Sequence, residues 1–209
     1  MAANARENIL NRIKEALVNP VPLPFPNNEE GKDIFVENTE DLSILFAKEF
    51  TSVSGNFSFC ENKKALKIQL QQLITEKGWT KIFYKESLFE NQLIELGIEE
   101  YKNLSLCEVS ITDCESLVAR TGTMVLGTGQ ASGRTTSVYA PIHICIAYAS
   151  QVVFDVKDAL ILMQEKYGAN FPSFITFATG PSRTADIEKT LVTGVHGPKE
   201  VYCFLVGEE

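Results

Sequence analysis

The spacing of apolar residues changes repeatedly along the chain between the period of a strand and the period of a helix. Residues 56–60 alternate apolar and polar side chains, which is typical of a strand. A leucine stripe at helical spacing follows over residues 66–77, and Gly78 closes it as a C-terminal cap. Residues 80–84 predict a second strand and residues 86–96 a second helix. Strands that alternate with helices predict β-α-β units around a largely parallel sheet.

The middle of the chain changes to short strands joined by turns. We expect these strands over residues 116–119, 123–128, 143–148 and 152–154. Asp155 then caps a helix that ends at Gly168, and residues 173–178 predict an apolar strand. Residues 183–191 predict a short helix, and residues 201–206 a last strand that is apolar on both faces. Both faces of that strand should be covered, so the pattern predicts an α/β domain with a part rich in strands.

The amino-terminal residues are separated from this pattern. Ile9, Ile13 and Leu17 lie at helical spacing and predict an amphipathic helix. Four prolines at alternate positions in residues 20–26 favour an extended arm of roughly 20 Å, at about 3.1 Å per residue. We therefore expect two parts, residues 1–26 and residues 27–209. The helix should dock on a distant surface or on another subunit, which allows a homo-oligomer.

The charge balance excludes several classes of partner. The chain has 19 Lys and Arg against 27 Asp and Glu and no basic run, which argues against nucleic acid or an anionic membrane as the main partner. No apolar run approaches the roughly 20 residues of a membrane helix. The first residues lack the apolar core of a secretory signal, so we expect a cytoplasmic protein.

The cysteines and histidines argue against a metal centre in this chain. The five cysteines are irregularly spaced, without a C-x-x-C pair, and the sequence has two histidines. A disulfide framework, a zinc site and an iron–sulfur cluster, which needs about four cysteine ligands, are all disfavoured. We expect no metal or cofactor bound by this chain itself.

The densest group of polar residues lies in residues 179–188, directly after the strand predicted over residues 173–178. Ligands of open α/β sheets bind at the carboxyl ends of strands, and the start of a helix there offers free N–H groups to an anion. Arg183 adds a planar fork that suits a carboxylate or a phosphate. The candidate anion-binding residues are Thr179, Gly180, Ser182, Arg183 and Thr184. The alternative is helix capping by Ser182 or Thr184, with Asp186 and Glu188 suiting the helix dipole.

A second candidate group lies in residues 193–198. Gly194 and Gly197 let the backbone approach a ligand closely, and His196 in this loop can act as an acid, a base or a carboxylate ligand. The alternative is a turn histidine bonded to backbone carbonyls. We expect the loops around Ser182 and His196 to form one anion pocket with Arg183 as its main charged contact. His143 is interpreted as a structural strand residue.

A third glycine-containing segment imitates a dinucleotide fingerprint. Gly127, Gly129 and Gly133 follow a predicted strand, but a fingerprint needs a helix after the glycines. The β-branched residues that follow, and Pro141, favour a hairpin loop instead. The chain also lacks the G-x-S-x-G elbow of serine hydrolases.

These segments together resemble the LUD-domain family. The most specific matches are residues 180–188 and 194–198, and the segments around Thr123, Arg134 and residues 141–144 match its middle portion. The family commonly has an acidic residue just before its Ser/Thr-Gly-Thr motif, where this chain has Arg120. The activity associated with that carboxylate is therefore in question here.

The resemblance implies a fold like that of the sugar-phosphate isomerases and CoA transferases, a Rossmann-like mixed sheet with a β-rich excursion. It also implies a role in oxidising L-lactate to pyruvate beside iron–sulfur partner subunits. His196, Asp186 and Glu188 are then candidate catalytic residues, and Thr123 and Arg134 join the candidate anion-binding residues. The sequence alone leaves open a free-standing isomerase or CoA-transferase-like enzyme, or a non-catalytic sensor or scaffold that binds an anion.

Overall fold

The computed structural model describes residues 2–18, 39–85, 90–98, 100–187 and 190–207. The chain divides into two units, Met1–Thr39 and Glu40–Glu209. The domain boundary that we expected at residue 26 lies outside the described residues and stays a prediction.

Five strands of the larger unit form a parallel sheet in the order β1-β11-β6-β3-β2. Their bounds are β1 Asn56–Cys60, β2 Ile82–Tyr84, β3 Val109–Thr112, β6 Ile142–Tyr148 and β11 Glu200–Val206. Residues 201–206 of β11 are all buried, as expected of a strand that is apolar on both faces. The predicted α/β class with a parallel sheet is confirmed.

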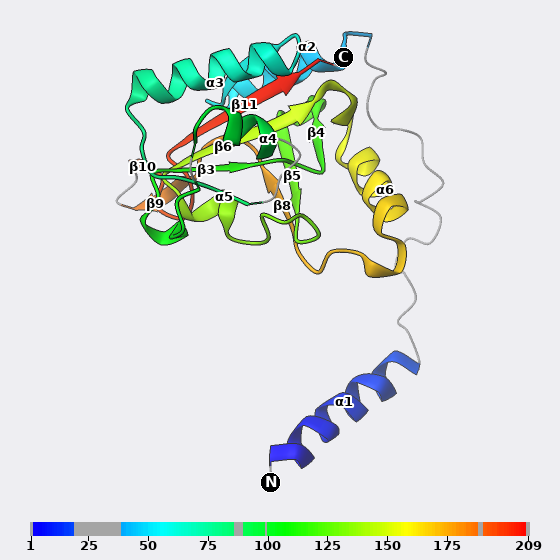
Figure 1. Ribbon diagram of the computed structural model, residues 1–209. Coiled ribbons are helices and arrows are strands. Elements are labelled where there is room, and N and C mark those ends of the chain that lie inside the picture. Colours follow the sequence, from blue (N-terminus) through cyan, green and yellow to red (C-terminus); the bar gives the residue numbers. More distant parts are fainter. Residues whose placement is uncertain (1, 19–38, 86–89, 99, 188–189, 208–209) are drawn as a thin grey trace. The chain divides into compact units, whose positions relative to one another are not determined.

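Two helices cover one face of this sheet, and Figure 1 shows the longer one, α3 (Lys63–Lys77), above β11. The side chain of Asn62 accepts hydrogen bonds from Lys64 N and Ala65 N and so begins α3, and Gly78 ends it with φ +68°, as the sequence predicts. The shorter helix is α4 (Glu90–Glu95). The buried residues that join the helices to the sheet are Leu66, Leu70, Leu93, Ile144, Ile146 and Phe204.

A second sheet and one helix cover the opposite face. The second sheet has the order β7-β4-β5-β8. Its strands are β4 Ser116–Val118, β5 Thr123–Gly127, β7 Val152–Val153 and β8 Ile175–Ala178. Helix α2 (Leu42–Ser52) begins at Asp41, which accepts from Ser43 N at 2.9 Å, and buries Phe46 and Phe50 completely. Both phenylalanines belong to the core between the two sheets.

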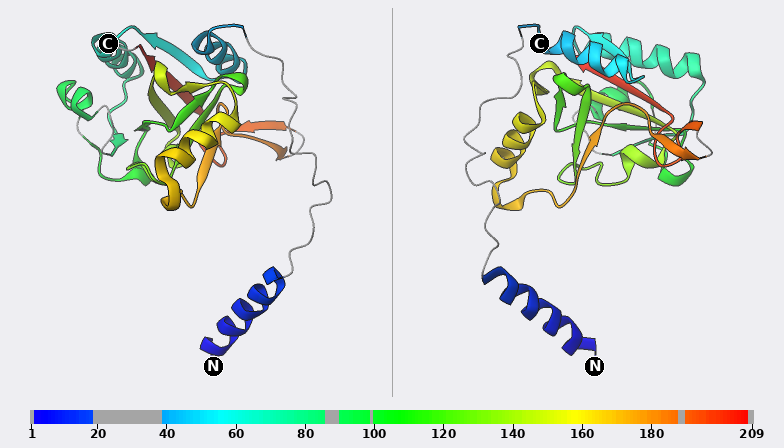
Figure 2. Two further views of the ribbon diagram at one scale, coloured as in Figure 1. Left: turned by 90° about the vertical axis from the view of Figure 1, so that its right-hand side faces the viewer. Right: turned by 180° about the vertical axis from the view of Figure 1, so that it is seen from behind.

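Helix α6 (Val156–Tyr167) forms the outermost layer. It begins at Asp155 and ends at Gly168, as predicted. Ala159 and Met163 pack on Val118 and Val125 of the second sheet, on the side away from the first sheet. The layers are therefore helices α3 and α4, the parallel sheet, the second sheet with α2, and α6, seen from two further directions in Figure 2.

Two predictions of local structure are wrong. Residues 183–191 do not form a helix but an antiparallel hairpin of β9 (Arg183–Ile187) and β10 (Thr190–Thr193), in which Thr193 pairs with Arg183. The β-branched residues of this segment suit strands better than helices. The glycine segment after β5 is not a hairpin loop either, because β5 pairs with β4 and β8 whereas β6 lies in the other sheet. The chain crosses between the sheets through turns and the one-turn helix α5 (Thr136–Tyr139).

The remaining elements are single turns and the amino-terminal helix. The single 3₁₀ turns are η1 Leu104–Leu106, η2 Ala119–Thr121, η3 Ala149–Gln151 and η4 Gly168–Asn170. Helix α1 (Ala2–Val18) exposes Ile9, Ile13 and Leu17, so the predicted amphipathic helix is present. The surface that covers this apolar face stays a prediction. Among the described residues, no helix is long and apolar enough to cross a membrane.

Candidate functional site

A cavity of about 330 Å³ lies where β8 ends and where the chain returns from the β9–β10 hairpin. Its wall combines two loops, residues 179–182 and residues 196–198, with part of α5 and with β6, β8 and β11. The lining residues outside the two loops are Ser137, Val138, His143, Thr176, Phe177, Ala178 and Val201.

The hairpin explains why the two loops meet. Thr193 pairs with Arg183, so the chain leaves the hairpin at the point where it entered. Ser182 N then donates to Pro198 O at 2.9 Å, and Gly194 N donates to Ser182 O at 2.9 Å. The predicted convergence of the loops around Ser182 and His196 is therefore present, although the helix that we expected between them is absent. Because strand β9 takes the place of this helix, Arg183–Ile187 offer no helix N-terminus to an anion, and the binding of an anion stays a prediction.

The structure brings several of the predicted site residues together. Thr179, Gly180, Ser182, His196 and Gly197 all line the cavity. Gly180 has φ +75°, and a Cβ atom there would lie 2.4 Å from Val53 O. The turn after β8 therefore requires glycine, because both its backbone angle and its distance from residue 53 exclude a side chain.

Other predicted residues do not line the cavity themselves. Arg183 Nη2 donates to Val53 O and to Ser54 Oγ, each at 2.7 Å, so its guanidinium holds the end of α2. Arg134 donates to Ser173 Oγ at 2.8 Å and lies over the ring of Phe174. The predicted residues that are not among the described residues of the cavity wall are Thr123, Arg134, Arg183, Thr184 and Gly194.

The two acidic candidates cannot be assigned to the cavity from their side chains. Asp186 belongs to β9, but its side chain is outside the described part of the structure, and Glu188 lies outside the described residues altogether. Their proposed catalytic role stays a prediction.

The structure adds His143, for which the sequence predicts only a structural role. It lies on β6 between the two sheets, is completely buried, and lines the cavity together with His196. Its Nε2 lies 2.8 Å from Thr112 Oγ1, and burial lowers the pKa of its ring below the usual value of 6.5. The sequence feature that could have indicated a functional role is the position of His143 in a strand that is apolar on both faces, because a buried polar ring needs a hydrogen-bond partner. His143 and His196 are the two histidines of the sequence.

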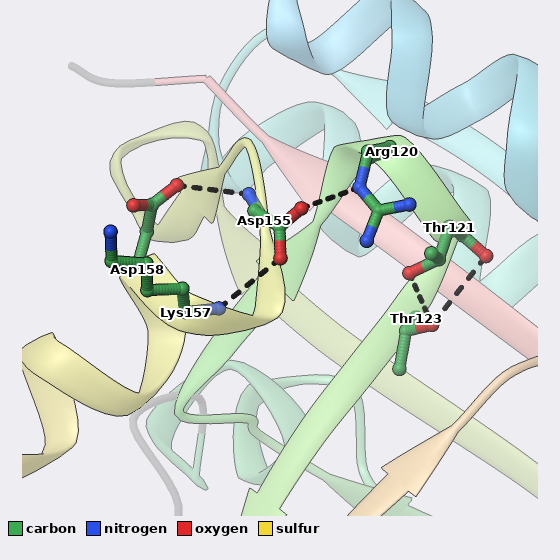
Figure 3. Close-up of polar contacts among 6 residues, drawn as sticks. All are labelled: Arg120, Thr121, Thr123, Asp155, Lys157 and Asp158. Carbon is green, nitrogen blue, oxygen red and sulfur yellow. Dashed lines mark hydrogen bonds and ion pairs between the residues drawn. The ribbon is translucent and has the colours of Figure 1, made fainter. Parts of the chain in front are cut away.

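A chain of threonine hydroxyls runs from the cavity to η2. Thr179 Oγ1 lies 2.7 Å from Thr123 Oγ1, which lies 2.7 Å from Thr121 Oγ1. Thr123 therefore supports the cavity wall through Thr179 rather than lining it. Figure 3 shows the Thr121–Thr123 end of this chain beside Arg120.

Arg120 forms an ion pair at the start of α6. Its Nε donates to Asp155 Oδ2 at 2.5 Å (Figure 3). Its backbone N donates to Phe154 O. Asp155 also accepts from Lys157 N, and its own backbone N donates to Asp158 Oδ2. Arg120 thus links η2 to the N-terminus of α6. The family resemblance leads us to expect an acidic residue at this position.

The cavity wall combines polar and apolar groups and carries no fixed charge among its described residues. Its side-chain donors and acceptors are two imidazoles and the hydroxyls of Ser137, Thr176, Thr179 and Ser182, beside apolar groups. Polyphosphate groups are usually held by lysine and arginine. The wall therefore suits a small ligand with at most one charged group.

The described residues offer no alternative metal centre. They contain no group of three or more His, Cys, Asp or Glu side chains that could hold a metal ion. The five cysteines are all buried and free of disulfides.

Comparison with known proteins identifies the family. Residues 87–206 match the model of the LUD domain. The chain belongs to the LUD domain family. The matched segment includes every described residue of the cavity wall.

Named relatives of this LUD-domain chain occur in several bacilli. Lactate utilization protein C 1 of Bacillus mycoides (strain KBAB4) is 32% identical over 152 residues, which cover 71% of this chain and 65% of that protein. Lactate utilization protein C of Bacillus subtilis (strain 168) is 36% identical over 114 residues, or 54% of this chain and 48% of that protein. The chain thus spans about half to two thirds of the length of these relatives.

A solved structure has the same fold. The crystal structure of a DUF162 family protein from Deinococcus radiodurans matches with a TM-score of 0.57 and 16% identity. The match covers 79% of this chain and 96% of that one.

Proposed function

We propose that this LUD-domain chain takes part in lactate utilization and binds a small carboxylate in the cavity between the two loops. The observation that carries the proposal is the similarity to proteins named lactate utilization protein C, at 32% and 36% identity. The family segment contains the whole described cavity wall, so the ligand of this chain is expected there.

The chemistry of the wall supports a small acid. A cavity of about 330 Å³ is at the lower end of the range of roughly 300–1,000 Å³ for small-molecule sites. Hydroxyl groups and imidazoles give a carboxylate directional hydrogen bonds without the dense positive charge that a phosphate site uses. The exposed His196 stands beside Gly197 and Ser182, where a ligand from solvent would first arrive.

The electrons from lactate need an acceptor outside this cavity. Oxidation of lactate to pyruvate removes two electrons, which proteins pass to redox cofactors. We propose that iron–sulfur clusters on partner subunits accept them and that this chain is an accessory subunit. The irregular spacing of its cysteines and the family resemblance support this division of labour. The kinship with the sugar-phosphate isomerases and CoA transferases belongs to the same proposal and rests on that resemblance.

Deletion of the gene in its own host tests the role. We expect the deletion strain to lose growth on L-lactate as sole carbon source and to grow normally on pyruvate, because the defect precedes pyruvate. The wild-type gene should restore growth, and a His196→Ala gene should restore it poorly. Normal growth of the deletion strain on L-lactate would contradict the proposed function.

A further inference from the structure

One nitrogen atom in the cavity wall has no assigned partner. His143 is completely buried, and its Nε2 is held 2.8 Å from Thr112 Oγ1 on the neighbouring strand. Its Nδ1 has no hydrogen-bond partner among the residues that the structure describes. A buried polar atom without a partner is costly, and such an atom calls for an explanation such as a ligand. His143 is among the residues that line the cavity, but its ring is closed to solvent, so a ligand in the cavity becomes the partner of Nδ1 when the wall around the ring moves apart to admit it.

The surroundings of His143 indicate what kind of ligand group it meets. Burial lowers the pKa of its ring, so the imidazole is neutral at pH 7. Ser110 lies beside His143 in the register of β3 and β6, and the partner of Nε2 is the hydroxyl of Thr112, so neutral hydroxyls come from the adjacent strand. A neutral imidazole nitrogen pairs well with a hydroxyl group and gives a carboxylate no net charge attraction.

The two histidines therefore differ in their suitability for the two ends of a ligand. His196 is exposed, so its ring keeps contact with water. It lies on the loop beside Ser182, whose hydroxyl group also lines the cavity. His143 forms the buried part of the same wall.

We propose that His143 recognises the hydroxyl group of a small 2-hydroxy acid through Nδ1, while the carboxylate of that acid faces Ser182 and His196. The proposal deepens the proposed function and rests on it. Thr112 is then a positioning residue, because its hydroxyl fixes the ring through Nε2 and leaves Nδ1 to the ligand.

Calorimetric titration with L-lactate and propionate tests this assignment on the full chain. The two acids share the carboxylate and the carbon chain, and propionate lacks the hydroxyl. We expect wild type to bind L-lactate about tenfold more tightly than propionate, as one hydrogen bond in a buried site allows. His143→Leu should bind both acids alike. Thr112→Val, which keeps the imidazole but removes its anchor, should reduce the preference to about threefold or less.

The matched control is the other histidine. His196→Gln should weaken the binding of both acids by the same factor and keep the preference for L-lactate. Thermal unfolding of each variant shows whether it is folded. If His143→Leu does not fold, the acid preference of Thr112→Val tests the role of His143. Equal binding of both acids by wild type, or an unchanged preference in a folded His143→Leu or Thr112→Val, would overturn the role of His143 alone. Binding of neither acid to wild type would overturn the proposed small-acid site and the role of His143 with it.

Discussion

Replacement of Gly122 by alanine should strongly destabilise the protein. Gly122 is buried at the end of η2 with φ +58°, and an added Cβ atom would lie 2.3 Å from Phe50 N in α2. The left-handed backbone costs about 1–2 kcal/mol for a residue with a Cβ atom, and forcing helix and turn apart costs about 1–3 kcal/mol more. Denaturant unfolding should therefore show a loss of about 2–5 kcal/mol in the free energy of unfolding.

The matched control is Gly133→Ala. Gly133 also has a positive φ, +67°, but nothing lies within 4 Å of the position of an added Cβ atom. The Gly133→Ala variant should lose about 1–2 kcal/mol of its free energy of unfolding, because only the left-handed backbone is strained. Equal losses of stability in the two variants would show that α2 does not pack against the end of η2.

Replacement of Asp155 by alanine should cost about 2–4 kcal/mol at pH 7, because this side chain has two functions. It caps α6 through Lys157 N, and it accepts the charged hydrogen bond of Arg120 at 2.5 Å. Both partners are mostly shielded from water, with 17% of the Asp155 side chain and 31% of the Arg120 side chain exposed. Asp155→Asn keeps an oxygen that can cap the helix, so this variant should lose only the stabilisation that comes from the charge of Asp155.

The stabilisation that depends on the charge of Asp155 should be lost in acid. The hydrogen bond from Arg120 lowers the pKa of Asp155 below its ordinary value of 3.8 in the folded state. The ion pair therefore stabilises the protein fully above about pH 4, and this contribution is lost as the pH falls through the lower pKa of the folded state. Urea unfolding should show the stabilities of wild type and Asp155→Asn converging as the pH falls below 3.8 and through the lowered pKa of Asp155. A constant difference between them from neutral to acid pH would contradict the ion pair. Glu95→Gln, at a well-exposed pair with Lys67, should change stability by less than about 0.5 kcal/mol.

The sequence pattern predicts most of the fold where one period persists over many residues. The stripes of α3 and α6, with their caps at Gly78 and Asp155, and the doubly apolar strand β11 are where the spacing indicates. Helix α2 and strand β3 were not predicted. The alternation of Val109, Ser110, Ile111 and Thr112 is typical of a strand, but it extends over only four residues.

The hairpin β9–β10 shows the limit of local patterns. Its sequence predicts a helix because a Gly-Pro turn followed by acidic residues is typical of a helix start. The pairing of Thr193 with Arg183 and the bond from Ser182 N to Pro198 O are tertiary contacts that spacing does not reveal.

The sequence predicts the loop residues of the candidate site but not the buried residues of its wall. Ser182 and His196 stand out as polar residues in glycine-containing turns, and the structure brings both to one cavity. Arg183 was selected for its charge, but it bonds to Val53 and Ser54 because β9 carries it toward the end of α2. His143 was missed because its neighbours on β6 are apolar, and only the packing of two sheets shows that its ring reaches a cavity.

Histidine-selective NMR tests the central claim, that a small acid binds between the two loops, most directly. The sequence has two histidines and both line the cavity, so the two ring Cε1–H signals report on the site alone. We expect L-lactate to shift both signals in a saturable manner, with one dissociation constant, while sodium chloride at equal ionic strength leaves them unchanged. Signals that stay in place at high L-lactate concentration would contradict the account.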